Sequence, residues 1–197
     1  MPEMAKHKVH RDTDIAGDPN VGNHHVINTA RLDLILFTPE TLEAVLSGRG
    51  SSIDGVALPA DWVRRSERVL RRRLDQVSRD PECAPWLLRA IVRRETREFV
   101  GRIGFHGKLG TNVLGALDAV ELGYAVESAF RRQGFAEEAI RGMLDWAQTQ
   151  SISRFMASIG PTNTPSLALA AKFGFAEVAR VIDEEGDGPE IVFELRT

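Results

Sequence analysis

Residues 129–140, AFRRQGFAEEAI, constrain the fold of this chain more than any other segment, because a glycine-containing turn there joins a strand-like run to a helix-like run. The strand is predicted at 119–126, and apolar residues recur at helical spacing from Ala136 to Ala147. Gly134 and Ala136 keep bulky side chains away from the turn, where successive backbone N–H groups converge. The segment therefore predicts an anion-binding site suited to a pyrophosphate, although a purely structural turn between a strand and a helix has a similar sequence.

Apolar periodicity and turn residues along the chain predict a mixed α/β sheet without internal repeats. Thr38 before Pro39 marks the start of one helix as its N-cap, and Thr164 before Pro165 marks another. The glycine-rich segment 48–55 is interpreted as a linker between helices. The predicted elements are strands at 25–38, 86–94, 98–107, 119–126, 154–159, 175–182 and 190–196, and helices at 39–48, 59–80, 136–147 and 163–174.

Length and composition limit the class of protein. We expect one domain over residues 24–197, preceded by a polar N-terminal segment, 1–23, that is disordered. The single cysteine, Cys83, leaves no partner for an internal disulfide and favours a reducing, cytoplasmic location. The formal net charge of −3 gives no general attraction to nucleic acid or anionic membranes, and no apolar run approaches the roughly 18–20 residues that span a bilayer. No Cys or His cluster has the spacing of metal ligands, so we expect no metal.

The predicted helix 59–80 is rich in arginine and allows two interpretations. Its apolar stripe, which includes Trp62, Leu70 and Val77, faces the core, and the arginines mostly occupy the remaining arc. A basic stripe of this kind binds nucleic acid in some proteins. In an acidic protein we favour a solvated face whose long side chains cover the rim of the core. The arginines concerned are Arg64, Arg65, Arg68, Arg71, Arg72 and Arg73.

The strand at 119–126 has two unequal faces. One face carries Val120, Leu122, Tyr124 and Val126. Gly123 and Ala125 leave the other face nearly bare, because successive residues of a strand point to opposite sides. Small residues within a strand allow another backbone or a ligand to approach closely.

Two sequence motifs resemble those of the GNAT N-acetyltransferases. Residues 131–136 have the R/Q-x-x-G-x-G/A form of the acetyl-CoA-binding motif in that family. The runs ELGYAV, RRQGFAEEAIRGMLDWA and NTPSLALAAKFGF are similar to its RimJ/RimL-type branch, and the similarity extends from Thr29 to the C-terminus. The resemblance implies a mixed, mostly antiparallel sheet of about seven strands flanked by about four helices. In its centre two parallel strands, here 119–126 and 154–159, would splay apart.

The resemblance also implies acetyl-CoA as co-substrate. The pantetheine arm of the coenzyme would lie between the splayed strands like an additional strand, beside Tyr124, Ala125 and Val126. Asn163 matches a family asparagine that contacts this arm, and Lys172 matches a position near the adenosine end. The diphosphate would bind the backbone N–H groups of the turn Arg131, Arg132, Gln133, Gly134, Phe135 and Ala136.

The reaction that the resemblance implies requires a neutral amine to attack the thioester, so a base must remove the ammonium proton. Glu121 stands where the family has a recurrent glutamate and is the first candidate for this base, with a merely structural carboxylate as the alternative. Backbone donors near Val126 would polarise the thioester carbonyl. Other branches have a tyrosine acid at the position of Ala170, whereas Ser166 is the candidate acid of the RimL-like branch and would also contact the coenzyme. His106 is a third possibility.

The resemblance implies an N-acetyltransferase but leaves its acceptor open among a protein N-terminus, an amino sugar or antibiotic, and a small amine. An acidic turn predicts an acceptor that is cationic in solution, unless these residues only solvate the turn. The turn contains Asp183, Glu184, Glu185 and Asp187. A non-catalytic acyl-CoA-binding module is the alternative function, because the usual tyrosine is missing. We expect a monomer or a homodimer, with neither a membrane nor a nucleic acid as partner.

Overall fold

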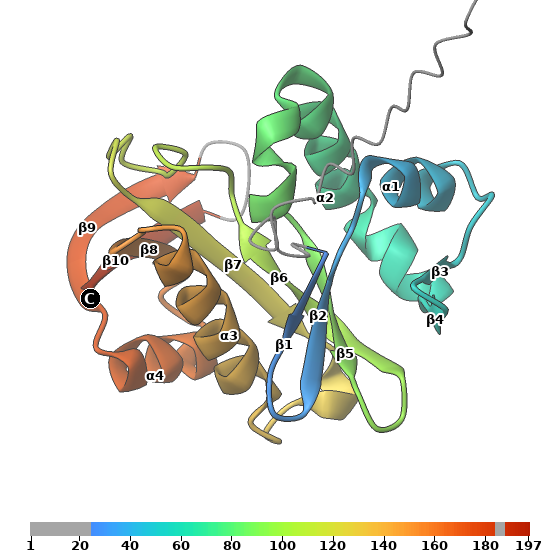
Figure 1. Ribbon diagram of the computed structural model, residues 1–197. Helices are drawn as coiled ribbons and strands as arrows, with labels where there is room; N and C mark the ends of the chain where they lie inside the picture. The colour runs from blue at the N-terminus through green and yellow to red at the C-terminus, as the bar shows by residue number, and fades with distance from the viewer. Residues whose placement is uncertain (1–24, 184–187) are drawn as a thin grey trace, which may run out of the picture.

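The computed structural model of the chain describes residues 25–183 and 188–197, and the predicted disordered segment 1–23 lies outside them. One eight-stranded sheet has α3 and α4 on one face and α1 and α2 on the other (Figure 1). The strands of this sheet are β1 (Val26–Asn28), β2 (Leu32–Leu36), β5 (Arg89–Arg93), β6 (Glu98–Phe105), β7 (Val120–Val126), β8 (Arg154–Ile159), β9 (Ala176–Asp183) and β10 (Gly188–Arg196). The helices are α1 (Pro39–Leu46), α2 (Ala60–Arg79), α3 (Phe135–Thr149) and α4 (Thr164–Phe173), with short 3₁₀ helices at Pro81–Trp86 and Ser128–Phe130.

The order of strands in the sheet is β1-β2-β5-β6-β7-β8-β10-β9. Neighbouring strands are antiparallel, except that β7 and β8 are parallel. These two pair only at Val120 with Phe155 and at Glu121 with Met156, and then separate toward their C-terminal ends. The predicted mixed, mostly antiparallel sheet with splayed central parallel strands is confirmed, with eight strands in place of about seven.

Each face of the sheet has its own hydrophobic core. Between the sheet and α3 the core includes Phe105, Phe155 and Met143, which are fully buried. Between the sheet and α1 with α2, the ring of Trp62 lies 5.9 Å from that of Phe37 and 4.6 Å from that of Phe99, measured between centroids. The sheet is therefore packed on both faces, although β7 and β8 separate at its centre.

Two predicted segments have more structure than expected. The single strand predicted at 25–38 is a hairpin of β1 and β2, because Thr29 closes a turn by donating its N–H to the Leu32 carbonyl oxygen over 2.9 Å. The linker predicted at 48–55 contains the start of a small hairpin, β3 (Ser52–Ile53) and β4 (Val56–Ala57). Its turn places Gly55 at a φ of 74°, which glycine adopts without strain.

Two predicted details of the helices are wrong. Helix α4 is capped by Asn163, whose side chain accepts the Ser166 N–H, and Thr164 is its first helical residue rather than its N-cap. On α2, Arg73 is only 9% exposed, although it was predicted on the solvated arc. Arg73 faces the sheet side of the helix, where its guanidinium donates to the His106 carbonyl oxygen over 2.9 Å.

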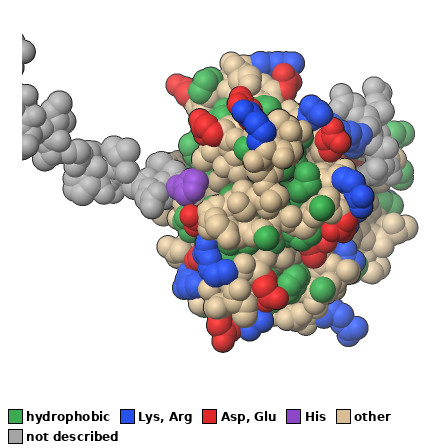
Figure 2. Space-filling view, turned by 90° about the vertical axis from the view of Figure 1, so that its right-hand side faces the viewer, with side chains coloured by type: hydrophobic (Ala, Val, Ile, Leu, Met, Phe, Trp, Pro, Cys, Tyr) green, Lys and Arg blue, Asp and Glu red, His purple; other side chains and the backbone are tan. Residues whose placement is uncertain are grey.

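The other arginines of α2 fit a solvated face with balanced charges better than a purely basic surface. Arg65, Arg71 and Arg79 each pair with an acidic side chain four residues earlier on the helix. Pairs at this spacing lie on one side of a helix and neutralise each other. On the face of the molecule seen in Figure 2, basic and acidic side chains are interspersed rather than gathered by sign.

Candidate active site

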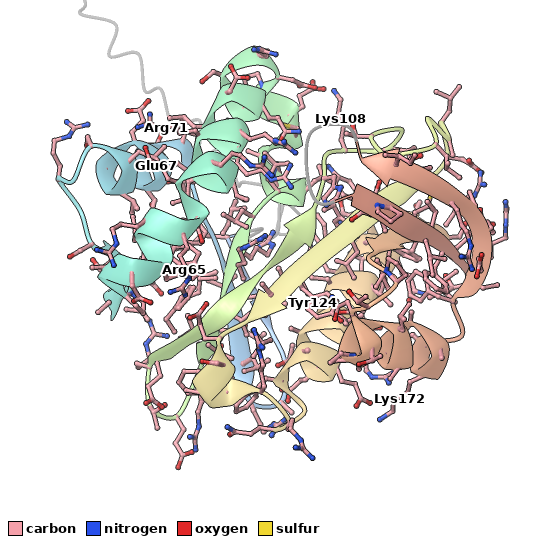
Figure 3. All side chains as sticks on the ribbon, turned by 180° about the vertical axis from the view of Figure 1, so that it is seen from behind. Arg65, Glu67, Arg71, Lys108, Tyr124 and Lys172 are labelled. Atoms are coloured by element: carbon pink, nitrogen blue, oxygen red, sulfur yellow. The ribbon has the colours of Figure 1, made fainter. Side chains whose placement is uncertain are left out.

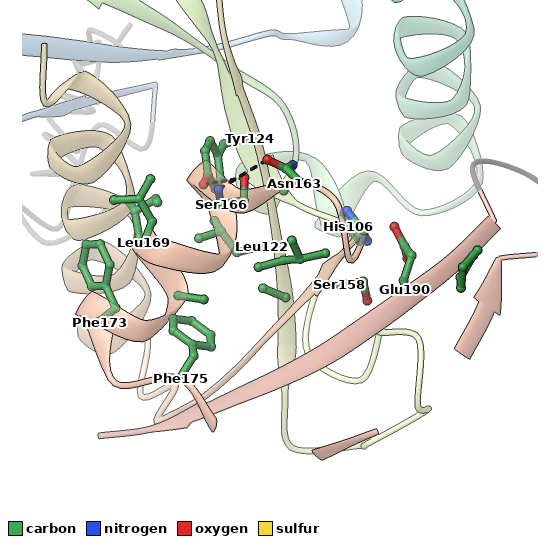
Figure 4. A pocket seen from close by; sticks show the side chains of 17 residues that line it. His106, Leu122, Tyr124, Ser158, Asn163, Ser166, Leu169, Phe173, Phe175 and Glu190 are labelled. Carbon is green, nitrogen blue, oxygen red and sulfur yellow. Dashed lines mark hydrogen bonds between the residues drawn. The ribbon is translucent and has the colours of Figure 1, made fainter. Parts of the chain in front are cut away.

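The separation of β7 from β8 opens a cavity of about 290 Å³ through the middle of the sheet. Tyr124, Asn163 and Ser166 lie together at one end of this cavity, and His106 and Glu190 lie at the other (Figure 4). Its walls between these ends are largely apolar, with Leu122, Leu169, Phe173 and Phe175 among the lining residues. We call this space the central cavity.

The edge of β7 that borders the central cavity presents backbone groups. His106 N–H donates to the Glu121 carbonyl oxygen over 2.7 Å, and Glu127 N–H donates to that of Val100 over 2.9 Å. Backbone groups alternate in direction along a strand, so the odd-numbered residues of β7 face β6 and the even-numbered ones, including Tyr124, face β8. Past Glu121 this edge has lost its pairing with β8 and is suited to a ligand that bonds like a strand.

The turn before α3 forms a second cavity, of about 550 Å³, which we call the turn cavity. Gly134 caps α3 with a φ of 81° and without a side-chain hydrogen bond to the helix N-terminus. Arg132 also has a positive φ, 62°, and Phe135 and Ala136 begin the helix. The first N–H groups of a 15-residue helix therefore face a turn whose capping residue, Gly134, has no side chain. This cradle fits a diphosphate.

The turn cavity adjoins the central cavity. Both are lined by Tyr124, Asn163, Ser166 and Leu169. The predicted coenzyme-binding residues Val126, Arg131 and Arg132 also line the turn cavity. Ala125 lines it too, although its backbone pairs with Arg102 of β6.

Several side chains of the turn bind the protein itself. Arg131 Nε donates to the Val126 carbonyl oxygen over 3.0 Å, and Gln133 donates its side-chain N–H to Ala129 O over 3.1 Å. Arg31, from the turn between β1 and β2, donates to the Gln133 carbonyl oxygen and stacks over the Phe135 ring at 4.7 Å. Sequence reasoning missed Arg31, because nothing in its local sequence signals a contact with a segment about a hundred residues away.

A lysine and a glutamate connect the two helices that flank the turn cavity. Lys172 Nζ of α4 lies 2.6 Å from Glu137 Oε2 of α3. Lys172 is exposed at the end of α4, whereas Tyr124 lies at the centre of the molecule on β7 (Figure 3). The lysine that the resemblance placed near the adenosine end thus lies beside the turn cavity, which Glu137 lines.

A hydroxyl pair marks the junction of the two cavities. The Tyr124 phenol donates a hydrogen bond to Ser166 Oγ over 3.0 Å. Burial raises the pKa of Tyr124 against the smaller opposing effect of this hydrogen bond, so the phenol keeps its proton through neutral pH. The sole tyrosine of the chain therefore comes from β7 and lies beside the α4 helix on which other branches carry their tyrosine acid.

The predicted base, Glu121, is held inside the sheet. It is 2% exposed and accepts hydrogen bonds from Val113 N–H over 2.6 Å and from Ser158 Oγ over 2.7 Å. His106 Nδ1 lies 3.5 Å from Glu121 Oε1. Burial raises the pKa of Glu121, but the interactions with His106, Ser158 and the Val113 N–H together outweigh it and lower the pKa below its usual range. The carboxylate is ionised at neutral pH, and its oxygens are occupied.

His106 occupies the bare face that the sequence predicted on β7. A Cβ atom on Gly123 would lie 2.9 Å from His106 Nε2, so the absent side chain makes room for the imidazole. His106 lines the central cavity and is 42% exposed at its side chain. The structure thus brings Glu121 and His106 together, with Ser158 as a partner that sequence reasoning missed. The sequence did offer one signal of this role, because Ser158 is a polar residue within the predicted strand 154–159.

A third cavity, of about 420 Å³, opens on the α2 side of the sheet, and we call it the outer cavity. It shares His106 and Glu190 with the central cavity, and it is also lined by Glu121 and by Arg73 of α2. The three cavities therefore adjoin one another in a row, which we call the passage, from the N-terminus of α3 to the α2 side of the sheet. Of the acidic turn predicted near the acceptor, residues 184–187 lie outside the described residues.

A splayed parallel strand pair followed by a glycine-containing turn at the start of a helix is the arrangement that the sequence motifs implied. Residues 31–176 match the acetyltransferase (GNAT) domain family. The chain belongs to the GNAT acetyltransferase family. The match includes β7, the turn before α3, β8 and α4. Members of this family use acetyl-CoA, and the cradle and the free strand edge of this chain fit that co-substrate.

Solved GNAT structures share this fold. A GNAT-family acetyltransferase from Bacillus anthracis matches with a TM-score of 0.58 at 18% identity, covering 87% of this chain and 98% of that one. An acetyltransferase from Salmonella typhimurium, which modifies the N-terminal serine of ribosomal protein L7/L12, matches with a TM-score of 0.58 at 15% identity, covering 87% and 99%. A RimL structure in complex with coenzyme A also matches with a TM-score of 0.58 at 15% identity. The match covers 87% of this chain and 97% of that one. At these identities the likeness concerns the fold.

Two curated relatives are similar in sequence over part of their length. The uncharacterized N-acetyltransferase YjdG of Bacillus subtilis is 31% identical over 86 residues, which are 43% of this chain and 48% of that protein. The uncharacterized N-acetyltransferase p20 of Bacillus licheniformis is 30% identical over 97 residues, which are 49% of this chain and 52% of that protein. The chain thus matches about half the length of these relatives.

Metal ligands, membrane-spanning helices and reactive thiols are the other features that bear on function. Residues 25–183 and 188–197 contain no group of His, Cys, Asp and Glu side chains arranged to hold a metal ion. None of the helices described is long and apolar enough to cross a bilayer. Cys83 is buried, and this burial is the main cause of the raised pKa of its thiol. The nearby charge of Asp80 raises the pKa further. A thiol of this kind is a poor nucleophile.

Proposed function

We propose that this protein transfers the acetyl group of acetyl-CoA to a primary amine by direct attack in a ternary complex. One observation carries the proposal: three adjoining cavities, the passage, lead from the turn at the N-terminus of α3 to an imidazole on the other side of the sheet. Coenzyme and acceptor could enter this passage from opposite ends and meet in the central cavity. A module that only binds acyl-CoA needs the cradle but has no use for the far opening.

The coenzyme would be held mainly by backbone groups. The N–H groups from Arg132 to Ala136 would bind the diphosphate, and the even-numbered edge of β7 at Tyr124 and Val126 would bind the pantetheine arm. Asn163 and Ser166 line the path between these two parts. Acetyl-CoA supplies the acetyl group as a thioester, whose carbonyl oxygen backbone donors of β7 would polarise.

His106 would take the proton of the acceptor amine. Its Nε2 lies over Gly123 at the wall of the central cavity, whereas the oxygens of Glu121 are occupied inside the sheet. Glu121 is then a positioning residue: it orients Nδ1 of the imidazole and stabilises the imidazolium that forms. This assignment keeps Glu121 in proton handling, as the family resemblance implies, but places His106 between it and the acceptor.

Tyr124 would return a proton to the departing thiolate. Its phenol lies at the junction of the coenzyme and acceptor halves of the passage, and its raised pKa keeps it protonated. Ser166, the acid implied by the resemblance, accepts the phenol hydrogen bond and can pass a proton between the phenol and the sulfur. When the amine attacks the carbonyl carbon, an N–C bond forms, the C–S bond breaks, His106 takes the amine proton and the thiolate receives a proton from this pair. The imidazolium then loses its proton to solvent and the phenolate regains one from solvent, which restores both groups.

The RimJ/RimL-type branch makes a protein N-terminus one acceptor to test. The Salmonella neighbour modifies the N-terminal serine of L7/L12, and a neighbour from Vibrio fischeri is a ribosomal-protein-S5-alanine acetyltransferase. An α-amine is also the easiest amine to deprotonate, because its usual pKa lies near 8 rather than above 10. We therefore place α-amines first among the acceptors.

The proposal is tested by thiol release from acetyl-CoA across a panel of amines. The panel would contain peptides with free N-termini, lysine side-chain analogues, polyamines and amino sugars, with an enzyme-free blank for each. We expect release above the blank with at least one class of amine. Tight binding of acetyl-CoA without release for any amine would favour the acyl-CoA-binding module instead.

A further inference from the structure

Arg73 is a buried cation that opens onto the outer cavity. It is 9% exposed, and its Nη1 donates to Gln76 Oε1 over 2.6 Å and to the His106 carbonyl oxygen over 2.9 Å. Its Nε has no hydrogen-bond partner, and Arg73 forms no salt bridge with any residue that the structure describes. Burial, with smaller effects of the neighbouring charges of Arg102 and Arg72, lowers its pKa to about 10 against weaker opposing effects of Cys83 and Glu121, so it is cationic at neutral pH. A buried charge that is held without a salt bridge is costly.

Arg102 adds a second positive charge to the same region. It lies on β6 on the same face of the sheet as His106, and burial lowers its pKa. It makes no hydrogen bond or salt bridge within the part of the chain that the structure covers. Glu127 attracts it from a distance, but the Glu127 carboxylate lies 2.8 Å from Arg65. Two guanidinium groups that repel each other are thus held beneath α2 without a bound carboxylate.

Arg89 shows what a purely structural buried arginine looks like in this fold. It is fully buried and also has an Nε without a hydrogen-bond partner. Its other nitrogens donate to the backbone carbonyl oxygens of His25, Leu34 and Pro85, and its guanidinium stacks on Trp146 at 5.3 Å. Arg89 is not among the residues that line the outer cavity, whereas Arg73 is.

The outer cavity is lined by both acidic and basic side chains. Glu190 and His106 line this cavity and the central cavity, and Arg72 and Arg73 of α2 line the outer cavity. Because Arg73 donates to the backbone carbonyl oxygen of His106, its guanidinium lies close to the residue whose imidazole is the proposed base. An amine at His106 and an anion at Arg73 would therefore belong to one small ligand or to one end of a peptide.

We propose that Arg73 binds a carboxylate of the acceptor, so that the acceptor is a primary amine with a carboxylate a few bonds from its nitrogen. This inference rests on the proposed acetyl transfer and names its substrate class. Arg73 Nη1 already donates to Gln76 and to His106, and Nε is enclosed, so a carboxylate would accept one charge-assisted hydrogen bond from Nη2. A singly charged carboxylate is favoured over a phosphate, because Glu121 and Glu190 also line the cavity and repel a dianion more strongly. A free amino acid and the N-terminus of an acidic peptide both carry this chemistry.

Matched pairs of acceptors test the inference. Glycine is compared with glycinamide, and the tetrapeptide amide Ser-Asp-Ala-Ala with Ser-Asn-Ala-Ala, by kcat/KM for thiol release. We expect the carboxylate member of at least one pair to be favoured by about tenfold or more, the usual size of a charge-assisted hydrogen bond. The pair that shows the preference identifies the source as an amino acid or a peptide.

Variants assign the preference to the residue. Arg73→Met should remove it, and Arg73→Lys should retain part of it. Arg71→Met is the matched control, because Arg71 lies on the same helix but is 62% exposed and paired with Glu67. In the wild-type protein, where folding is not in question, propionate should compete with the acceptor and propionamide should not. Equal rates within both pairs, or a preference that survives Arg73→Met, would overturn the carboxylate site.

Direct binding separates this inference from the proposed reaction. Calorimetric titration of the acidic and neutral tetrapeptide amides and of glycine and glycinamide into the full chain requires no turnover. Selective binding of a carboxylate member that is lost in Arg73→Met would support the site even if no amine were acetylated. Acetylation of both members of each pair without selective binding would leave the reaction standing and contradict the site.

Discussion

The imidazole of His106 fills the space above Gly123, where a Cβ atom would lie 2.9 Å from Nε2. Gly123 lies within β7 and has an ordinary strand backbone, so alanine can replace it without backbone strain. Because the clash is with the end of a side chain, Gly123→Ala should fold and displace the imidazole while leaving Glu121 in place. The pair thus offers a way to move the proposed base without deleting it.

We expect Gly123→Ala to lower kcat/KM for the acceptor on the order of 10–100-fold, since a positioned general base contributes at least that much. The affinity for acetyl-CoA, measured by calorimetry, should change little. An unchanged rate with the preferred amine would remove His106 from the chemistry. A thermal melt of the variant checks that the fold is intact.

Glu121→Gln tests the positioning of the imidazole. The amide retains the shape of the carboxylate but turns an N–H toward one of the donors Val113 N–H or Ser158 Oγ, so we expect a loss of about 1–3 kcal/mol in unfolding free energy. We also expect kcat to fall about tenfold or more and to recover partly at high pH, where the amine is already neutral. A kcat equal to wild type from pH 6 to 9 would make Glu121 purely structural.

Tyr124→Phe removes the phenol that donates to Ser166 and leaves the ring in place. If this pair protonates the thiolate, kcat should fall about tenfold, whereas KM for acetyl-CoA should change little. The loss should persist to pH 9, because burial raises the pKa of the phenol and keeps it a donor there. Steady-state kinetics over pH 6–9 make the comparison. Wild-type kcat throughout would assign the proton to solvent.

Gly134→Ala tests the anion cradle, with Gly48→Ala as its control. Both glycines have positive φ angles, 81° and 71°, so each alanine should cost on the order of 1 kcal/mol in stability. A Cβ on Gly134 stands at the turn, 3.3 Å from Arg31 Nη2, whereas a Cβ on Gly48 meets nothing within 4 Å. Calorimetry should show acetyl-CoA affinity reduced about tenfold in Gly134→Ala alone. Equal affinities in both variants would place the diphosphate elsewhere.

Glu138 joins α3 to the hairpin of β1 and β2. It accepts from Thr29 Oγ1, Arg31 N–H and Arg31 Nε, each over 2.6 Å. Burial opposes ionisation, but these hydrogen bonds outweigh it and lower the pKa of Glu138. We expect Glu138→Gln to reduce the unfolding free energy by about 1–2 kcal/mol at pH 7.

The pH dependence of that loss has a defined sign. A lowered folded-state pKa contributes stability above the ordinary glutamate pKa, near 4.3, which is lost as the pH falls through the folded value. The difference between wild type and Glu138→Gln should therefore be full above roughly pH 5 and shrink toward pH 3. Denaturant unfolding at several pH values measures it. A difference independent of pH would mean that the charge of Glu138 contributes nothing.

Local features were the ones that the sequence predicted well. The turn around Gly134, the strand 119–126 and the position of α4 depend on glycine conformation, alternation and a proline near the start of a helix, which act within a few residues. Arg31 and Arg73 could not be assigned in this way, because their roles come from contacts with Gln133 and His106. The hairpin at Thr29 was missed for a similar reason, since Glu138 of α3 completes its turn.

The most direct test of the account is an intact-mass time course of protein and acceptor together, with acetyl-CoA and the preferred amine from the panel. Direct attack predicts one acetyl group on the acceptor for each coenzyme A released, with the mass of the protein unchanged at every time point. Coenzyme A released without acetylated acceptor, or an acetyl group that appears on the protein before it appears on the amine, would contradict it.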